Sequence, residues 1–258
     1  MENHTNIDKT DGPRGTICLL PSLLTTISLF SGFYSIISAI NGLFIHAAVA
    51  LIISAVFDGL DGRVARMTGT ASLFGKEYDS LCDLVAFGVA PAIVAYLWTL
   101  ESFGRYGWLA AFLYVATTAL RLARFNVQDS SCGNMFTGLP CPAAAGTIAT
   151  TVLFGRFTGI SSEAMGLAML AMVYGLSYLM VSSVQYWSFK NPETTKAKRF
   201  QAMVFMVLLI TVVATEPQVT LFVLAILYVI SGPFGALSRL LTRSKVEVPD
   251  EHEESFYR

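Results

Sequence analysis

Charged residues are scarce in this sequence. Asp, Glu, Lys and Arg make up 14% of its 258 residues, whereas about a quarter of a typical soluble domain is charged. Hydrophobic residues account for 54%, so water is not expected to be the main solvent of the chain. A net charge of -1 also lacks the clustered basic excess that nucleic-acid binding requires, and no nucleic-acid partner is expected.

Paired cysteines are missing as well. None of the four cysteines has the CxxC spacing of a metal or redox motif, and all lie within or beside apolar segments. They are therefore interpreted as small apolar packing residues. The four are Cys18, Cys82, Cys132 and Cys141.

The two ends of the sequence lack long apolar runs. Residues 1–16 are polar and partly acidic, unlike a cleaved signal peptide, which needs a basic start and an apolar core. They are predicted to form a flexible cytoplasmic arm, and the acidic residues 243–258 a flexible cytoplasmic tail. No internal repeat is visible between them. Residues 17–242 are therefore expected to form one membrane domain.

Apolar runs fill the rest of the chain. A helix of about 20 such residues crosses the hydrocarbon core of a bilayer, and eight windows of roughly this kind are present. The sequence therefore predicts an all-α integral membrane protein, a polytopic bundle of about eight transmembrane helices. The fifth window is short and rich in Ala, Thr and Gly, which also suits tight helix packing. The windows cover residues 17–40, 43–66, 72–98, 107–127, 142–158, 163–187, 199–215 and 218–241.

Basic residues are distributed unevenly around these windows. With eight spans both termini lie on one side, together with every Lys and Arg except Arg105 and Arg156. The positive-inside rule places the more basic side in the cytoplasm. A multi-pass protein of the cell membrane is therefore expected, with both termini and the loops after even-numbered spans in the cytoplasm.

Four aspartates lie where the second predicted span ends and the third begins. Asp58 and Asp61 are three residues apart, and Asp79 and Asp83 are four apart, so each pair shares a helix face. The short, glycine-containing link between the spans allows an antiparallel hairpin in which four carboxylates meet. One acidic residue in the middle of a membrane helix costs about 2.5 to 3.5 kcal/mol on insertion scales. The cluster therefore requires neutralisation.

Divalent cations suit such a cluster. Carboxylate oxygens are typical ligands of Mg²⁺ and Mn²⁺ and do not distinguish the two. Two ions would balance four negative charges and can clamp a phosphoryl group. Arg66, at the end of the second span, is expected to bind phosphate oxygens. Gly62, Ala65 and Gly75 are small enough to let a substrate approach the backbone; helix packing is their alternative role, and membrane anchoring is that of Arg66.

These residues form a spaced pattern: Asp58-x-x-Asp61-Gly62-x-x-Ala65-Arg66, eight residues, Gly75, three residues, Asp79, three residues, Asp83. The pattern resembles the signature of the CDP-alcohol phosphotransferases at every position. The resemblance implies a two-metal enzyme, homodimeric, that replaces CMP on a CDP-activated group with an alcohol. It also implies the following roles: Asp58, Asp61, Asp79 and Asp83 bind metal, Asp83 is in addition the general base, and Gly62, Ala65, Arg66 and Gly75 border the CDP moiety.

Other segments are similar to the members of this family that use serine. They are LLPSLLTTISLFSGFY, FGVAP, RLARFN and GLPCPAAA. The resemblance thus implies transfer of the phosphatidyl group from CDP-diacylglycerol to L-serine, giving phosphatidylserine and CMP. Arg121 and Arg124 share a helix face and are candidates for binding the serine carboxylate. Ordinary positive-inside anchoring is the alternative for both.

Other functions stay open at this point. The same chemistry with glycerol 3-phosphate or inositol phosphate would require binding of a second phosphate. A divalent cation transporter is a further alternative, because intramembrane carboxylates also line ion pathways. Against transport, the four aspartates cluster on one side of two adjacent spans, and no comparable acids appear deep in the later spans. A chain that binds the CDP-lipid without turning it over is the third alternative.

Overall fold

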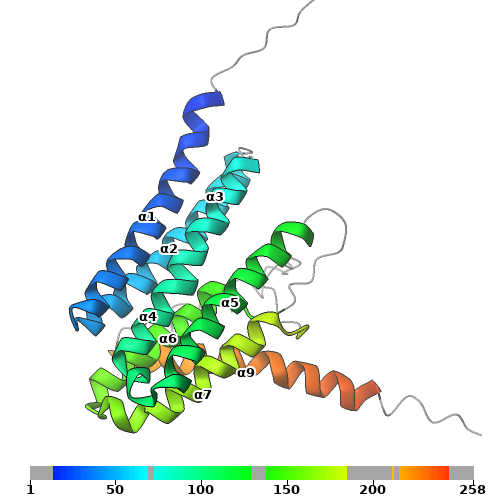
Figure 1. Cartoon of the computed structure of the whole chain (residues 1–258). Helices are drawn as coiled ribbons and strands as arrows, with labels where there is room; N and C mark the ends of the chain where they lie inside the picture. Colours follow the sequence, from blue (N-terminus) through cyan, green and yellow to red (C-terminus); the bar gives the residue numbers. More distant parts are fainter. Residues whose placement is uncertain (1–13, 69–72, 129–137, 185–210, 212–214, 244–258) are drawn as a thin grey trace, which may run out of the picture.

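The part of the chain described by the structure consists of helices and contains no strand. This computed structural model describes residues 14–68, 73–128, 138–184, 211 and 215–243. The all-α prediction is confirmed for these residues. The α-helices are α1 (Arg14–Ile40), α2 (Phe44–Thr68), α3 (Leu73–Asp83), α4 (Ala90–Trp98), α5 (Arg105–Gln128), α6 (Cys141–Thr158), α7 (Ser162–Val181) and α9 (Pro217–Arg243), and the π-helix η1 (Leu84–Val89) and the 3-10 helix η2 (Leu100–Phe103) complete the set (Figure 1).

Every predicted span except 199–215 has helix at its place. The span 199–215 lies outside the described residues apart from residues 211 and 215, so the count of eight stays a prediction. Most of the predicted arm and tail also lies outside the described residues. Five helical segments are long and apolar enough to cross a membrane, which makes the chain a polytopic membrane protein. They are Pro21–Ile40, Phe44–Thr68, Phe74–Trp98, Ser162–Val181 and Pro217–Gly235.

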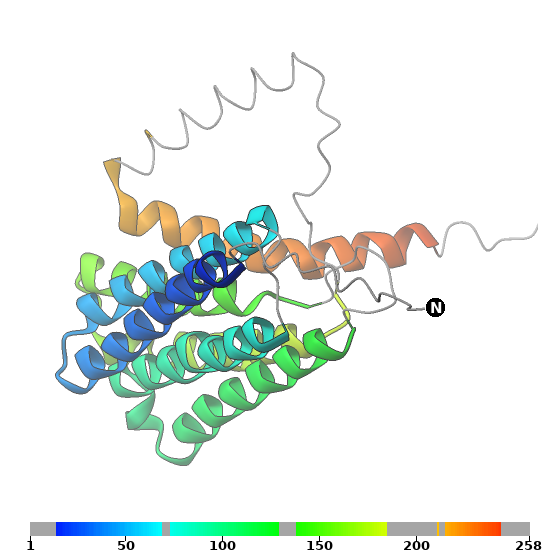
Figure 2. The same ribbon diagram turned by 90° about the horizontal axis from the view of Figure 1, so that it is seen from above.

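Helix α6 lies at the centre of the bundle. It contacts α2, α4, α7 and α9, and α5 packs on α7. Helix α1 packs on α2 (Figure 2). Ala144 and Ala149 of α6 are fully buried. A Cβ added to Gly155 would lie 2.8 Å from the Trp98 ring and 2.6 Å from Met165 Sδ. Small side chains thus let neighbouring helices approach closely, and the tight packing expected for the fifth window is confirmed.

The third span changes its winding after α3. In η1 the chain follows the wider π pattern, in which the Ala90 N–H donates to Val85 O, five residues earlier. Pro91 has no N–H, and its ring conflicts with the carbonyl four residues before it. A wider turn ahead of the proline relieves this conflict. The π-helix also packs directly on α1, because a Cβ on Gly32 would lie 2.7 Å from Ala86 Cα.

Helix α7 ends at Val181, whereas the predicted span ran to residue 187. The chain turns into an extended conformation at Ser182. It then runs beside the segment that precedes α6: the N–H of Gly138 donates to Val184 O at 2.8 Å, and the N–H of Leu139 donates to Leu179 O at 3.1 Å. The second bond provides a partner for the Leu179 carbonyl in the last turn of the helix, where carbonyl groups lack helical partners. Tertiary hydrogen bonding therefore stops α7 before its apolar run is finished.

Two of the four cysteines can be compared with their predicted role. Cys82 and Cys141 are buried and form no disulfide, as expected for packing residues. The side chains of the other two, Cys18 and Cys132, lie outside the described residues.

Candidate active site

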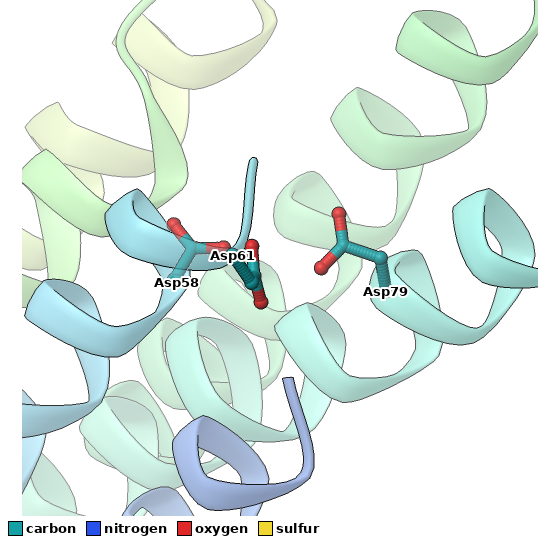
Figure 3. Close-up of side chains that lie close together, drawn as sticks. All are labelled: Asp58, Asp61 and Asp79. Carbon is teal, nitrogen blue, oxygen red and sulfur yellow. The ribbon is translucent and has the colours of Figure 1, made fainter. Parts of the chain in front are cut away.

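Helices α2 and α3 present aspartates to one another (Figure 3). Asp58 and Asp61 project from the C-terminal half of α2 and Asp79 projects from α3. One carboxylate oxygen of each lies within 4.8 Å of those of the other two. Asp61 is only 4% exposed, and the other two are half-buried. The structure thus brings three of the four predicted carboxylates into one small group.

Asp83, the last residue of α3, adjoins this group without belonging to it. Its carboxyl group is hydrogen-bonded to that of Asp58. Two carboxyl groups approach in this way only when a proton or a cation lies between them, because two bare carboxylates repel each other and both are acceptors. Asp83 therefore contacts the cluster on the side of Asp58.

One turn of α1 supports both aspartate helices. The Thr25 hydroxyl donates to Asp61 Oδ2 at 2.8 Å, and the Asp61 carboxylate also accepts the N–H of Gly62. The next residue, Thr26, shares a hydrogen bond with the Tyr78 hydroxyl on α3 at 2.9 Å. Sequence reasoning did not identify these partners. The available signal was a pair of adjacent threonines within an otherwise apolar run.

The cluster fits a divalent metal ion. Asp79 Oδ1 is buried and has no hydrogen-bond partner among the described residues. A buried polar atom without a partner is costly, and a bound cation would provide one. An all-carboxylate donor set is typical of hard ions such as Mg²⁺ and Mn²⁺. Asp58, Asp61 and Asp79 are therefore suited to hold such an ion.

The residues predicted to border CDP lie at the same end of α2 and α3. The exposed Arg66 side chain folds back along α2, so that its Nη1 would be 3.6 Å from a Cβ added to Gly62. Apart from this guanidinium and the helix itself, nothing in the described chain lies within 4 Å of that position. Ala65 and Gly75 are half-buried. The surface of α2 beside the aspartates is thus open and has a cation next to it, which suits an anionic ligand.

The two arginines predicted to bind serine differ in their surroundings. Arg121 Nη1 donates to Met180 O at 3.2 Å, and its guanidinium also hydrogen-bonds Cys141. Gly138 has a φ of 83°, and a Cβ there would lie 2.7 Å from Arg121 Nη1. Gly138 therefore lies against the Arg121 guanidinium, and the segments RLARFN and GLPCPAAA are adjacent in the structure. Arg124 is half-buried and donates no hydrogen bond to any residue in the described ranges.

Known proteins are similar to this chain over most of its length. The sequence model of the CDP-alcohol phosphatidyltransferase family matches residues 18–181. A Helicobacter pylori protein named CDP-diacylglycerol--serine O-phosphatidyltransferase is 37% identical over 224 residues, which cover 85% of this chain and 92% of that protein. A Mycobacterium tuberculosis protein of the same name is 34% identical over 262 residues, covering 95% and 88%.

An archaeal protein is similar over a shorter stretch. The archaetidylserine synthase of Methanothermobacter thermautotrophicus is 40% identical over 169 residues, which cover 65% of this chain and 69% of that protein. The matched family range contains all four aspartates, Arg66, Arg121 and Arg124. The resemblance inferred from the aspartate pattern is thus confirmed, and the chain belongs to the CDP-alcohol phosphatidyltransferase family.

Proposed function

We propose that this chain transfers the phosphatidyl group of CDP-diacylglycerol to the hydroxyl of L-serine, producing phosphatidylserine and CMP. The observation that carries the proposal is the group of three aspartates with oxygens within 4.8 Å of one another in a chain of this family. Serine as the acceptor is supported by the names of the relatives from Helicobacter pylori and Mycobacterium tuberculosis. The archaeal relative is likewise named for a serine product.

The aspartates are proposed to hold two divalent ions, Mg²⁺ or Mn²⁺. Asp58, Asp61 and Asp79 would supply ligands from the observed group, and Asp83 would add one from its contact with Asp58. Bound ions would offset the charge that develops on the phosphates during transfer. The buried Asp79 Oδ1, which has no hydrogen-bond partner in the described part of the chain, supports this assignment.

Asp83 is proposed as the general base. It would accept the proton of the serine hydroxyl while the serine oxygen bonds to the phosphorus attached to diacylglycerol. The bond from that phosphorus to the CMP oxygen breaks, and CMP leaves. A general base must lie within hydrogen-bonding reach of the proton it accepts. The position of Asp83 at the edge of the cluster, beside Asp58, supports this role.

The CDP moiety is proposed to lie on the open surface of α2. Arg66 would bind its phosphate oxygens and offset negative charge on the leaving CMP. Gly62, Ala65 and Gly75 would border the nucleotide, because they place little side-chain volume between it and the helices. The space beside Gly62 supports this arrangement, because apart from the Arg66 guanidinium and the helix itself no described residue lies within 4 Å of a Cβ added there.

Arg124 is the better candidate of the two arginines for the serine carboxylate. It has no hydrogen bond to a described residue and lies three residues from Arg121 on the same helix. Arg121 is proposed to act mainly by holding α5 to the segment before α6 and to the end of α7, because its guanidinium contacts Met180 O and Cys141. A bidentate pair with a carboxylate requires a guanidinium that is not engaged in this way.

We place the protein in the cytoplasmic membrane as a homodimer, with the aspartates and both termini on the cytoplasmic side. The distribution of Lys and Arg supports this orientation. The start of α1, the start of α3 and the end of α5 lie toward the same end of the bundle (Figure 1). The active site would then draw serine from the cytoplasm and CDP-diacylglycerol from the inner leaflet.

The test is release of labelled CMP from CDP-diacylglycerol by the purified protein in detergent. L-serine, glycerol 3-phosphate and inositol phosphate are compared as acceptors, each with Mg²⁺ or Mn²⁺ and with a chelator. We expect release with serine alone, and none with the chelator. Release with another acceptor would contradict the assignment of serine. No release with any acceptor would contradict the proposal, and Mn²⁺ flux into liposomes would then test transport.

A further inference from the structure

Asn126, close to the C-terminal end of α5, is hydrogen-bonded to three residues of α3. Its Nδ2 donates to Ser80 Oγ at 2.9 Å. The Ser80 hydroxyl lies 3.2 Å from two acceptors, Asn126 Oδ1 and Lys76 O of its own helix. Nδ2 also lies 3.4 Å from Glu77 Oε2. Lys76 Nζ donates to the backbone oxygen of Asn126 at 3.2 Å. Both the amide group and the main chain of one residue thus contact the helix that carries Asp79.

These contacts adjoin the proposed metal ligands. Ser80 directly follows Asp79 and is three residues before Asp83, so it is on the turn of α3 that presents both carboxylates. The hydrogen bond from Asn126 Nδ2 to Ser80 Oγ sets the distance of this turn from α5. Because a hydrogen bond is directional, it also restrains the rotation of the turn.

The electrostatics favour the same arrangement. The ammonium group of Lys76 lies at a carbonyl near the end of α5, where the helix dipole is negative and the last carbonyl groups lack helical partners. The amide of Asn126 donates toward the carboxylate of Glu77. Lys76 and Glu77, the two charged residues of α3 that contact Asn126, thus each meet a group of opposite partial charge.

We propose that Asn126 is a positioning residue for the metal site. Through Ser80 it holds α3 where Asp79 meets Asp58 and Asp61. Because Asn126 shares α5 with Arg124, the same contact sets the separation between the aspartates and the proposed serine site. The inference rests on the proposed function for the identity of the acceptor, whereas its statement about metal affinity concerns the chain's own carboxylates.

Mn²⁺ binding to the full-length protein in detergent, measured by electron paramagnetic resonance, tests the inference without turnover. We expect Ser80→Ala and Asn126→Ala each to weaken Mn²⁺ binding about tenfold, the lower end of the range for residues that orient metal ligands. Ser80→Thr retains the hydroxyl and should bind Mn²⁺ like the natural protein. The double variant should bind no more weakly than either single variant, because both changes remove the same contact.

Asn41→Ala is the matched control. Asn41 also donates a side-chain hydrogen bond, to Ile37 O at 2.9 Å, but it precedes α2 and is about 25 Å along that helix from Asp61 at 1.5 Å per residue. Its loss should leave Mn²⁺ affinity unchanged. Unaltered affinity in Ser80→Ala and Asn126→Ala, or effects that multiply in the double variant, would overturn the inference.

Two further results distinguish a variant that does not fold from an error in the proposed acceptor. If Asn126→Ala does not yield folded protein, the comparison of Ser80→Ala with Ser80→Thr decides the question, since threonine retains the hydroxyl that alanine lacks. If the natural protein binds Mn²⁺ and Ser80→Ala weakens it, but serine releases no CMP, the proposed acceptor is wrong and the positioning role stands. A mainly structural role would lower the yield of folded protein and leave the Mn²⁺ affinity of the folded fraction unaltered.

Discussion

At the aspartate end of the bundle, hydroxyl, amide and carboxylate side chains hydrogen-bond one helix to the next. At the opposite end, around Gly155 and Gly166, close packing of helices against glycines is combined with a hydrogen bond from the Thr99 hydroxyl to Ser162 O. A hydrogen bond from Thr25 to Asp61 links α1 to α2, and one from Asn126 to Ser80 links α5 to α3. At the other end, a Cβ on Gly155 would meet Met165 Sδ at 2.6 Å.

The difference has a physical reason. A hydrogen bond specifies direction as well as distance, so it suits the end where carboxylates must be aimed at a common point. Between membrane helices, where lipid is as apolar as the side chains, association depends on van der Waals contact, which small residues increase. The hydrogen bonds orient the carboxylates, and the close packing holds the helices that carry them in fixed positions. Substitutions at the two ends should therefore fail in different ways.

The largest expected effect is on the rate of transfer. Asp83→Asn removes the proposed base with little change in shape, and we expect CMP release to fall by about 10²- to 10⁴-fold, the usual contribution of general acid–base catalysis. The folded yield in size-exclusion chromatography should be unaltered. Activity close to that of the natural protein would exclude Asp83 as the base.

A smaller effect is expected on acceptor binding. Arg124→Ala should raise the KM for serine about 10- to 100-fold, because a charge-assisted hydrogen bond contributes about 1.5 to 3 kcal/mol. The KM for CDP-diacylglycerol should change little. Arg105→Ala, at the opposite end of the same helix, is the control. Equal serine KM values in the Arg124 and Arg105 variants would show that Arg124 does not bind the acceptor.

At the glycine end the expected effect is on stability alone. Gly155→Ala should lower the free energy of unfolding by about 1 to 3 kcal/mol, the usual cost of overpacking. In Gly146→Ala of the same helix, the new Cβ would have no described residue within 4 Å apart from the helix itself, and this variant should be neutral or slightly stabilising. Thermal unfolding in detergent compares the two. A loss of Mn²⁺ affinity in folded Gly155→Ala would contradict the separation between the two ends.

The smallest effect is expected where one hydrogen bond is lost and another remains. Thr25→Val removes the hydroxyl that donates to Asp61, while the Gly62 N–H still donates to this carboxylate. Mn²⁺ affinity should fall about fivefold, the equivalent of roughly 1 kcal/mol for one hydrogen bond. Thr25→Ser should retain the affinity. If the Val and Ser variants bind Mn²⁺ equally, Thr25 does not support the site.

Several features could be predicted because they depend on local sequence. Helix length in a membrane follows from the thickness of the hydrocarbon core. Helix α2, and the continuous run from the start of α3 to the end of α4, thus begin and end within two residues of the predicted spans. The carboxylate pairs followed from helical spacing. The end of α7 could not be predicted, since Ser182 leaves the helix to continue beside the segment before α6.

The amino-acid sequence by itself determined that this chain is helical, lies in a membrane and carries two pairs of carboxylates. These features could be derived from composition and residue spacing because both act within single helices. Only the tertiary structure decided which side chains orient those carboxylates. Thr25 and Asn126 are 36 residues before Asp61 and 46 residues after Ser80, and nothing in local spacing specifies contacts over such separations. The packing of α1 and α5 against the aspartate helices creates them.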